Sequence, residues 1–230
     1  NANGEKEYAF IMTDISKFHL INDYWGYETG TKILNFVLRR MELFSASLFV
    51  NRYHSDVFVA VLDITGRKSS DVKKQIEEYN RQIIQEILKT FQINYFHLNT
   101  GIYYLKDTSI PAEQIISHTN IVREKAKTEL SGVCEYNNDI ALNEQHCADT
   151  IHSFKSALKQ KEFKIYFQPK ICGKDQTIAS AEALVRWQRG NDTMWYPDMF
   201  LSILEETGEI RALDYYVYEE TFAWMNQRRK

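Results

Sequence analysis

The fold of the C-terminal part of the chain is decided by the stretch Ala181-Glu182-Ala183-Leu184-Val185-Arg186-Trp187. It follows a second short apolar and aromatic run, Phe163-Lys164-Ile165-Tyr166-Phe167-Gln168-Pro169. Polar residues at every second position predict that both runs are β-strands. This alternation places Glu182, Leu184 and Arg186 on one strand face. A carboxylate and a guanidinium so arranged suit a metal ion and a phosphate, although a surface ion pair of little energetic value is the alternative.

Further motifs follow these strands in a fixed order. Pro197-Asp198-Met199-Phe200 precedes Glu205-Glu206-Thr207-Gly208-Glu209-Ile210, and Leu213-Asp214 comes next. Together with Glu182-Ala183-Leu184, Arg186 and the Tyr-Phe-Gln-Pro strand, this set resembles an EAL domain, a cyclic di-GMP phosphodiesterase module. The resemblance implies the first strands and helices of a TIM-type (β/α)8 barrel, whose active site forms at the C-terminal ends of its strands.

The resemblance also implies roles for three residues. Glu182 would be a ligand of Mg²⁺ or Mn²⁺, Arg186 would contact a substrate phosphate, and Gln168 would line the same pocket. The substrate in the family is cyclic di-GMP, and a bound divalent ion polarises the phosphoryl group and activates water. A full barrel takes about 250 residues, far more than follow Asn143. We therefore expect no complete catalytic set in this chain, and activity only in a longer parent protein.

The N-terminal half contains apolar segments with a different order. We expect strands, helices and a hairpin with the three-residue turn His54-Ser55-Asp56. The expected strands cover residues 8–13, 49–53, 57–62 and 96–104, and the expected helices cover residues 29–45, 69–91, 112–127 and, as a short amphipathic helix, 151–158. The order βαββαβα with an internal hairpin predicts an α+β sheet with helices.

This half resembles a GGDEF domain, which has the diguanylate cyclase fold. The resemblance rests on Asp14-Ile15-Ser16-Lys17-Phe18-His19-Leu20-Ile21-Asn22-Asp23, on Gly26 and Gly30 after it, and on the distance to the hairpin. It implies that Asp14 and Asp56 are vestigial metal ligands and that Asn22 is a vestigial guanine-binding residue.

Several departures from the family pattern weaken this site. His54-Ser55-Asp56-Val57-Phe58 replaces the Gly-Gly-Asp-Glu-Phe loop, Ser16 replaces a second acid, and Thr31 stands where an aspartate is expected. Glycine lets the backbone approach phosphate and adopt positive φ, which His54 and Ser55 hinder. We expect an inactive, regulatory domain that makes no cyclic di-GMP. Whether it binds GTP, or serves in dimerisation or signal transmission, stays open.

Composition limits the remaining functions. The 230 residues carry a net charge of −3 and contain three cysteines. The absence of a basic block argues against a nucleic-acid partner, and the odd, widely spaced cysteines favour a reducing compartment. The sequence contains no membrane-spanning apolar run, so we expect a cytoplasmic location. Asn1-Ala2 resembles a cloning remnant, and a missing segment of the parent could hold a membrane anchor.

The sequence thus predicts a degenerate GGDEF domain over residues 5–143 and the N-terminal portion of an EAL domain over residues 144–230. Two functions stay open at this point. Either the parent is a metal-dependent cyclic di-GMP phosphodiesterase that its altered cyclase domain regulates, or both domains form a non-catalytic nucleotide receptor or interaction scaffold. A homodimer is a further open expectation.

Overall fold

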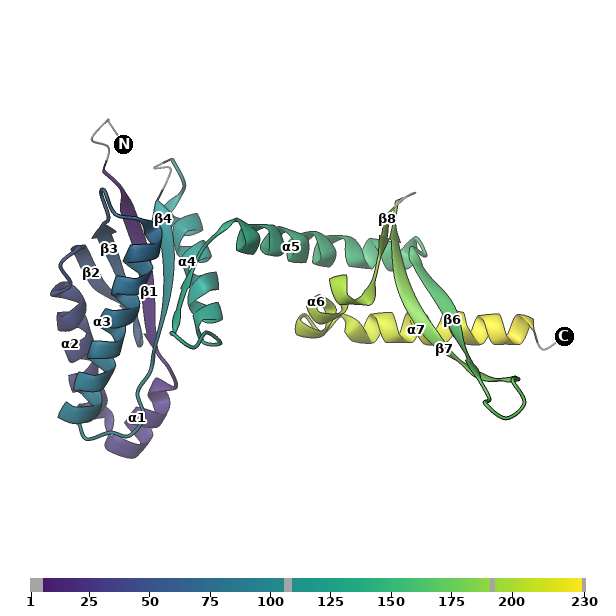
Figure 1. Cartoon of the computed structure of the whole chain (residues 1–230), viewed down its shortest axis with the longest axis horizontal. Coiled ribbons are helices and arrows are strands. Elements are labelled where there is room, and N and C mark those ends of the chain that lie inside the picture. Colours follow the sequence, from purple (N-terminus) through teal and green to yellow (C-terminus); the bar gives the residue numbers. More distant parts are fainter. Residues whose placement is uncertain (1–5, 106–108, 191–192, 229–230) are drawn as a thin grey trace. The chain divides into compact units, whose positions relative to one another are not determined.

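The apolar run near the N-terminus forms β1 (Tyr8–Ile15), the central strand of a five-stranded sheet with the order β2-β3-β1-β4-β5 (Figure 1). The computed structural model describes residues 6–105, 109–190 and 193–228, so Asn1, Ala2 and the expected domain start at residue 5 lie outside it. The other strands are β2 (Ser47–His54), β3 (Val57–Asp63), β4 (Leu98–Leu105) and β5 (Val133–Glu135). β1 is antiparallel to β3 and β4, whereas β5 is parallel to β4.

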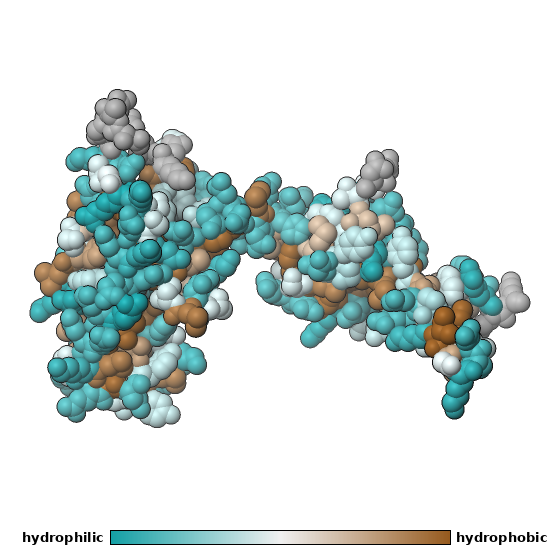
Figure 2. All heavy atoms as spheres, viewed as in Figure 1, coloured by the Kyte–Doolittle hydropathy of each residue, from teal (hydrophilic) through white to brown (hydrophobic). Residues whose placement is uncertain are grey.

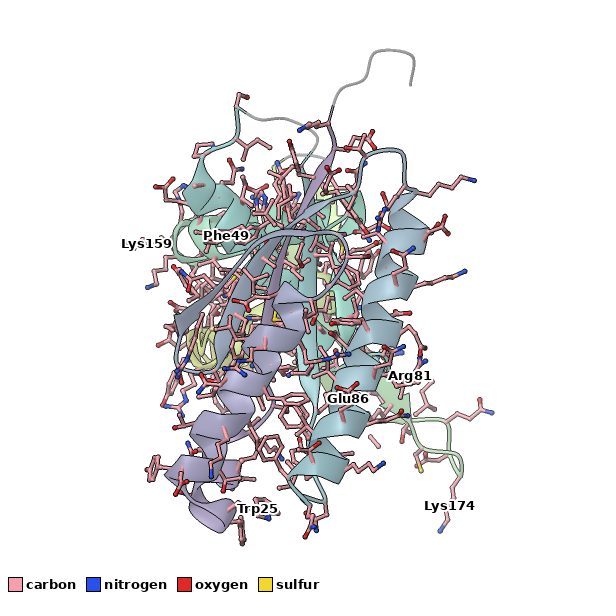
Figure 3. The ribbon with its side chains drawn as sticks, turned by 90° about the vertical axis from the view of Figure 1, so that its left-hand side faces the viewer. Trp25, Phe49, Arg81, Glu86, Lys159 and Lys174 are labelled. Atoms are coloured by element: carbon pink, nitrogen blue, oxygen red, sulfur yellow. The ribbon has the colours of Figure 1, made fainter. Side chains whose placement is uncertain are left out.

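Among the described residues, four helices complete the first unit of the chain, Asn1–Asn137, called unit 1 below. They are α1 (Phe18–Trp25), α2 (Tyr27–Glu42), α3 (Ser69–Thr90) and α4 (Ala112–Ala126). Figure 3 looks onto α2 and α3 with the sheet behind them. Figure 1 shows α4 on the side of the sheet away from α2 and α3. The main core joins α2 and α3 to the sheet, and a smaller cluster around Met12 includes Ile116 of α4.

Three local features of unit 1 differ from the sequence expectations. The expected helix over 29–45 begins earlier and follows the separate helix α1. The expected three-residue turn is wrong, because His54 pairs with Val57 and only Ser55 and Asp56 connect the strands. Strand β5 has three residues, too few to show a periodic pattern.

The second unit, Asn138–Lys230 or unit 2, begins with the long helix α5 (Asn138–Lys159). This helix includes Asn143, near which the sequence places the domain boundary. The unit continues with β6 (Phe163–Ile171), β7 (Ile178–Arg189), β8 (Thr193–Trp195), the 3-10 helix η1 (Pro197–Met199), α6 (Leu201–Glu206) and α7 (Ile210–Gln227). The three strands form an antiparallel sheet in the order β6-β7-β8.

The core of unit 2 is aromatic. Phe163 and Phe200 pack around the fully buried Trp187, whose indole nitrogen donates a 2.9 Å hydrogen bond to Glu162 Oε2. Figure 2 shows hydrophobic residues interrupting the hydrophilic surface at the end of unit 2 that carries the β6–β7 hairpin. Within the described residues, no helix has the length and apolar content needed to cross a membrane.

Candidate functional site

The hairpin of β6 and β7 brings the three expected EAL residues to one face. Gln168 lies directly opposite Glu182, and Lys164 lies opposite Arg186. Because successive side chains of a strand point to opposite faces, Gln168, Glu182 and Arg186 share a face. The structure therefore places the Gln168 amide beside the Glu182 carboxylate, with the Arg186 guanidinium on the same face four residues further along β7. The period-two pattern predicts this shared face.

The other face of the hairpin is its packing face. Phe163 and Trp187 are buried there, and the ring of Phe167 stacks on Trp224 of α7 with 4.3 Å between centroids. The hydroxyl of Tyr216, also in α7, donates a 2.9 Å hydrogen bond to the carbonyl of Phe163. Helix α7 thus anchors the apolar face and leaves the polar face open to solvent in the described part of the chain.

Glu182 and Arg186, the two charged site candidates of the open face, both have partners. Glu182 is 54% exposed at its side chain and pairs with Lys170, with 3.3 Å between Oε2 and Nζ. Arg186 donates a 2.8 Å hydrogen bond from Nη1 to the carbonyl of Val185. Its guanidinium carbon lies 5.1 Å from the centroid of Tyr196. These contacts hold the guanidinium of Arg186 at one nitrogen and at one face, while Glu182 is held only by an exposed ion pair.

The side-chain oxygen atoms of Glu182 and Gln168 are of the type that binds a hard divalent ion. The Glu182 carboxylate and the Gln168 amide oxygen are the oxygen ligands that Mg²⁺ prefers, but an octahedral shell takes more ligands than these. Among the described residues, no group of three or more His, Cys, Asp or Glu side chains could hold a metal ion. A metal site here therefore needs further ligands.

The second candidate site surrounds Asp14, near the end of β1. Asp14 lies opposite Asn99 of β4 and Val57 of β3, and its side chain is only 7% exposed. Asn99 Nδ2 donates a 2.7 Å hydrogen bond to Asp14 Oδ1. Arg123 of α4 pairs with Oδ2 through Nη1, and Lys127 Nζ lies 3.5 Å from the same oxygen. Both carboxylate oxygens are thus already bound.

Arg123 is itself held at several points. Its Nε and Nη2 donate hydrogen bonds of 3.1 Å and 2.7 Å to Asn120 Oδ1, and Nη2 donates one of 2.5 Å to Glu124 Oε1. Partial burial acts to raise the pKa of Glu124, but the hydrogen bond from Lys127 and the charges of Arg123 and Lys127 outweigh it and lower this pKa. The carboxylate of Glu124 therefore stays charged and completes a network of two acids and two bases.

Asp14, Asn99, Arg123 and Lys127 form a cluster at one end of the sheet, called the Asp14 corner below. The turn between β2 and β3 adjoins this corner. Asp56 is half-buried and directly precedes Val57, the residue opposite Asp14. Ser55 has a left-handed φ of 46°, a conformation that glycine adopts without strain. Arg52 Nε donates a 2.5 Å hydrogen bond to the carbonyl of Ser55 and fixes the turn. The structure thus brings Asp56 to the same end of the sheet as Asp14.

Asn22 lies in α1, where its amide packs against Gly30 of α2. A Cβ on Gly30 would overlap Asn22 Oδ1 and stand 3.2 Å from the Phe18 ring. The hydroxyl of Thr31 donates a 2.9 Å hydrogen bond to the carbonyl of Tyr27 within α2. A glycine at position 30 is therefore required for the packing of α1 on α2, and Thr31 supplies no acid beside Asn22.

A divalent ion does not fit the Asp14 corner as it stands. Its place at Oδ2 is taken by the guanidinium of Arg123, and a cation there would face Arg123 and Lys127. Sequence reasoning missed Arg123 and Asn99. A signal for Arg123 exists, because it follows Ile116 by seven residues and so falls on the apolar side of the predicted helix, where an arginine needs a partner.

Two family models match the chain. The model of the GGDEF domain of diguanylate cyclases matches residues 1–131, and the model of the EAL domain matches residues 151–230.

Several known proteins resemble most of the chain. The bifunctional diguanylate cyclase/cyclic di-GMP phosphodiesterase MucR of Pseudomonas aeruginosa is 22% identical over 94% of this chain and 32% of its own. The cyclic di-GMP phosphodiesterase PdeR of Escherichia coli is 25% identical over 90% of this chain and 31% of its own. The chain thus spans about a third of the length of these curated relatives.

Solved structures give similar matches. The GGDEF domain of DgcB from Caulobacter crescentus in complex with c-di-GMP has a TM-score of 0.48 and 18% identity, over 57% of this chain and 78% of that one. The S helix-GGDEF-EAL part of Vibrio cholerae LapD, bound to c-di-GMP, has a TM-score of 0.47 and 14% identity, over 98% and 53%. The GGDEF model covers more than half of the chain, and the chain therefore belongs to the GGDEF family, followed in tandem by part of an EAL domain.

Proposed function

We propose that the chain is part of a cyclic di-GMP signalling protein. Its EAL part contributes to a metal-dependent cyclic di-GMP phosphodiesterase, and its GGDEF part is a regulatory domain without cyclase activity. The observation that carries the proposal is the register of the hairpin, which puts Gln168, Glu182 and Arg186 on one face. The names of MucR and PdeR, which both include cyclic di-GMP phosphodiesterase, support it.

Each residue of this face has a proposed task. The Glu182 carboxylate and the Gln168 amide oxygen would hold Mg²⁺ or Mn²⁺ together with ligands from the rest of the protein. When bound, such an ion polarises the phosphoryl group and lowers the pKa of a bound water. Arg186 would orient a phosphate of cyclic di-GMP through its fork of donors, and its contact with Tyr196 restricts the guanidinium beforehand.

The inactivity of unit 1 as a cyclase has its own support. Cyclisation depends on divalent ions that neutralise a triphosphate, whereas Asp14 is bound to Arg123 and Asn99. Ser55 carries a side chain in the turn where the family has glycine. We leave GTP binding through Asn22 as a prediction, to be tested by calorimetric titration of the chain with GTP.

A non-catalytic nucleotide receptor is the alternative, and one observation favours it. Glu182 pairs with Lys170, so its carboxylate has a cationic partner without a metal ion. A receptor would bind cyclic di-GMP through Arg186 and leave it intact.

The test compares cyclic di-GMP hydrolysis by the whole protein that contains this chain with that of its Glu182→Ala variant, in Mg²⁺ or Mn²⁺. Removing a metal ligand costs several kcal/mol of transition-state stabilisation, so we expect turnover to fall at least about a hundredfold. Glu219→Ala, at an exposed acid on α7, is the control and should keep the rate. Equal rates for Glu182→Ala and the unaltered protein would refute the role of Glu182. Binding without hydrolysis in the unaltered protein would establish the receptor. Sedimentation of the same protein would test the homodimer.

A further inference from the structure

The corner around Asp14 contains a cation of its own. We infer that the guanidinium of Arg123 occupies the position of a divalent cation beside Asp14, so that unit 1 takes no metal there. The inference deepens the proposal that unit 1 is not a cyclase, and it rests on contacts that the sequence resemblance does not include.

The first argument is burial. The side chains of Arg123 and Asp14 are 9% and 7% exposed, and they pair directly. Charges this far from water are kept only when they are paired and hydrogen-bonded. Arg123 meets this condition through Asp14, Asn120 and Glu124. The pair is thus a structural element of unit 1 and not a flexible surface contact.

The second argument is charge. Asp14 and Glu124 face Arg123 and Lys127, and all four groups are linked by ion pairs. The cluster is therefore neutral. A divalent ion entering it would add two positive charges within reach of two cations, which a poorly solvated site disfavours.

The third argument is an unused oxygen. Among the described residues, Asn99 Oδ1 is buried and has no hydrogen-bond partner, while Nδ2 of the same amide binds Asp14. Asp14 Oδ2 and Asn99 Oδ1 are both hard oxygen donors of the type that Mg²⁺ and Mn²⁺ take. Without the guanidinium, Asp14 Oδ2 would be open to a cation, and Asn99 Oδ1 is a second oxygen in the residue that binds Asp14. Arg123 is therefore the residue that decides which cation Asp14 holds.

The test uses the whole 230-residue chain and reads hydrogen exchange in peptides from β1 and α4, which report on unit 1 alone. The probe is Mn²⁺, added to the unaltered chain and to Arg123→Met. We expect Mn²⁺ to leave exchange in the unaltered chain unchanged. In Arg123→Met, exchange should be faster without metal, and Mn²⁺ at about ten times its Kd should slow it about tenfold.

Two further variants make the result specific. Asp14→Asn/Arg123→Met removes both charges, so its β1 and α4 peptides should exchange more slowly than those of Arg123→Met. Mn²⁺ should not change this exchange rate. Arg40→Met is a control that breaks another ion pair of unit 1, in which Arg40 Nε lies 3.2 Å from Glu86 Oε2 of α3. Glu86 is labelled in Figure 3. This variant should also ignore Mn²⁺, because it leaves Asp14 paired.

Three results would overturn the inference. One is Mn²⁺ protection of the unaltered chain that Asp14→Asn abolishes. Another is a folded Arg123→Met chain that ignores Mn²⁺. The third applies if Arg123→Met does not fold. Failure of Asp14→Asn/Arg123→Met to fold as well would then show that Arg123 is not the counter-ion of Asp14. A separate assay of cyclic di-GMP synthesis from GTP tests the absence of cyclase activity, so the two ideas can fail independently.

Discussion

The amide nitrogen of Arg123 in α4 lies 2.6 Å from the point where a Cβ on Gly101 in β4 would stand. The carbonyl of Thr119 is closer still. Both are backbone atoms of one helix, so neither can move without shifting α4. Gly101→Ala should therefore push α4 off the sheet and loosen the contact of Arg123 with Asp14. We expect unit 1 to lose about 1–3 kcal/mol of stability, as overpacked sites do.

Hydrogen exchange in β4 and α4 measures this loss. Gly173→Ala is the matched control, because a Cβ on Gly173 in unit 2 meets nothing within 4 Å. It should stay within about 0.5 kcal/mol of the unaltered chain. Equal stability of the two variants would show that α4 does not need the close approach.

The local patterns explain how much of the fold could be predicted. Alternation in residues 163–169 and 181–187 predicts both strands of the hairpin and the shared face of Glu182 and Arg186. The apolar stripe along α3 predicts that helix almost to its ends. The family models confirm the two domain types. These features depend on neighbours within a few turns or residues, which a sequence displays directly.

The features that were missed depend on contacts between distant parts of the chain. Asp14 meets Asn99 and Arg123, which are 85 and 109 residues away. Helix α5 begins at Asn138, well before the expected residue 151. The sequence does not predict the first half of this helix, because that half buries little besides Ile140 and so lacks an apolar stripe. No periodic pattern marks such contacts or such a helix.

Cys134 of β5 should report the opening of unit 1. Burial raises the pKa of its thiol, and the charge of Glu129 adds to this effect. Cys134 pairs with Gly101 across the β4–β5 ladder, so alkylation requires both opening and deprotonation. We expect iodoacetamide to modify Cys134 more slowly than the half-buried Cys172.

Mass spectrometry of the labelled peptides gives both rates. Gly101→Ala should speed the labelling of Cys134 and leave that of Cys172 unchanged, because only unit 1 is altered. Labelling of Cys134 as fast as Cys172 in the unaltered chain would contradict its burial.

Lys170 should compete with a divalent ion for Glu182. Their exposed ion pair spans 3.3 Å, and such pairs are worth up to about 1 kcal/mol. In the whole protein, Lys170→Ala should therefore lower the Mg²⁺ or Mn²⁺ concentration for half-maximal hydrolysis by up to about fivefold. Lys174→Ala, at the free end of the hairpin (Figure 3), is the control. A higher metal requirement in Lys170→Ala would mean that Lys170 assists the site.

Ser55 is strained in the turn that replaces the family's glycines. Its φ of 46° is left-handed, which costs a residue with a Cβ roughly 1–2 kcal/mol. Glycine avoids this cost, but it loses more conformational entropy on folding, which offsets part of the stabilisation. Ser55→Gly should thus stabilise the β2–β3 hairpin by up to about 1 kcal/mol, seen as slower exchange in β3. Ser45→Gly, outside the turn, is the control and should not stabilise it. Because Arg123 still holds Asp14, Ser55→Gly should produce no cyclic di-GMP from GTP. Synthesis by this single variant would show that the turn, and not the cation beside Asp14, prevents cyclase activity.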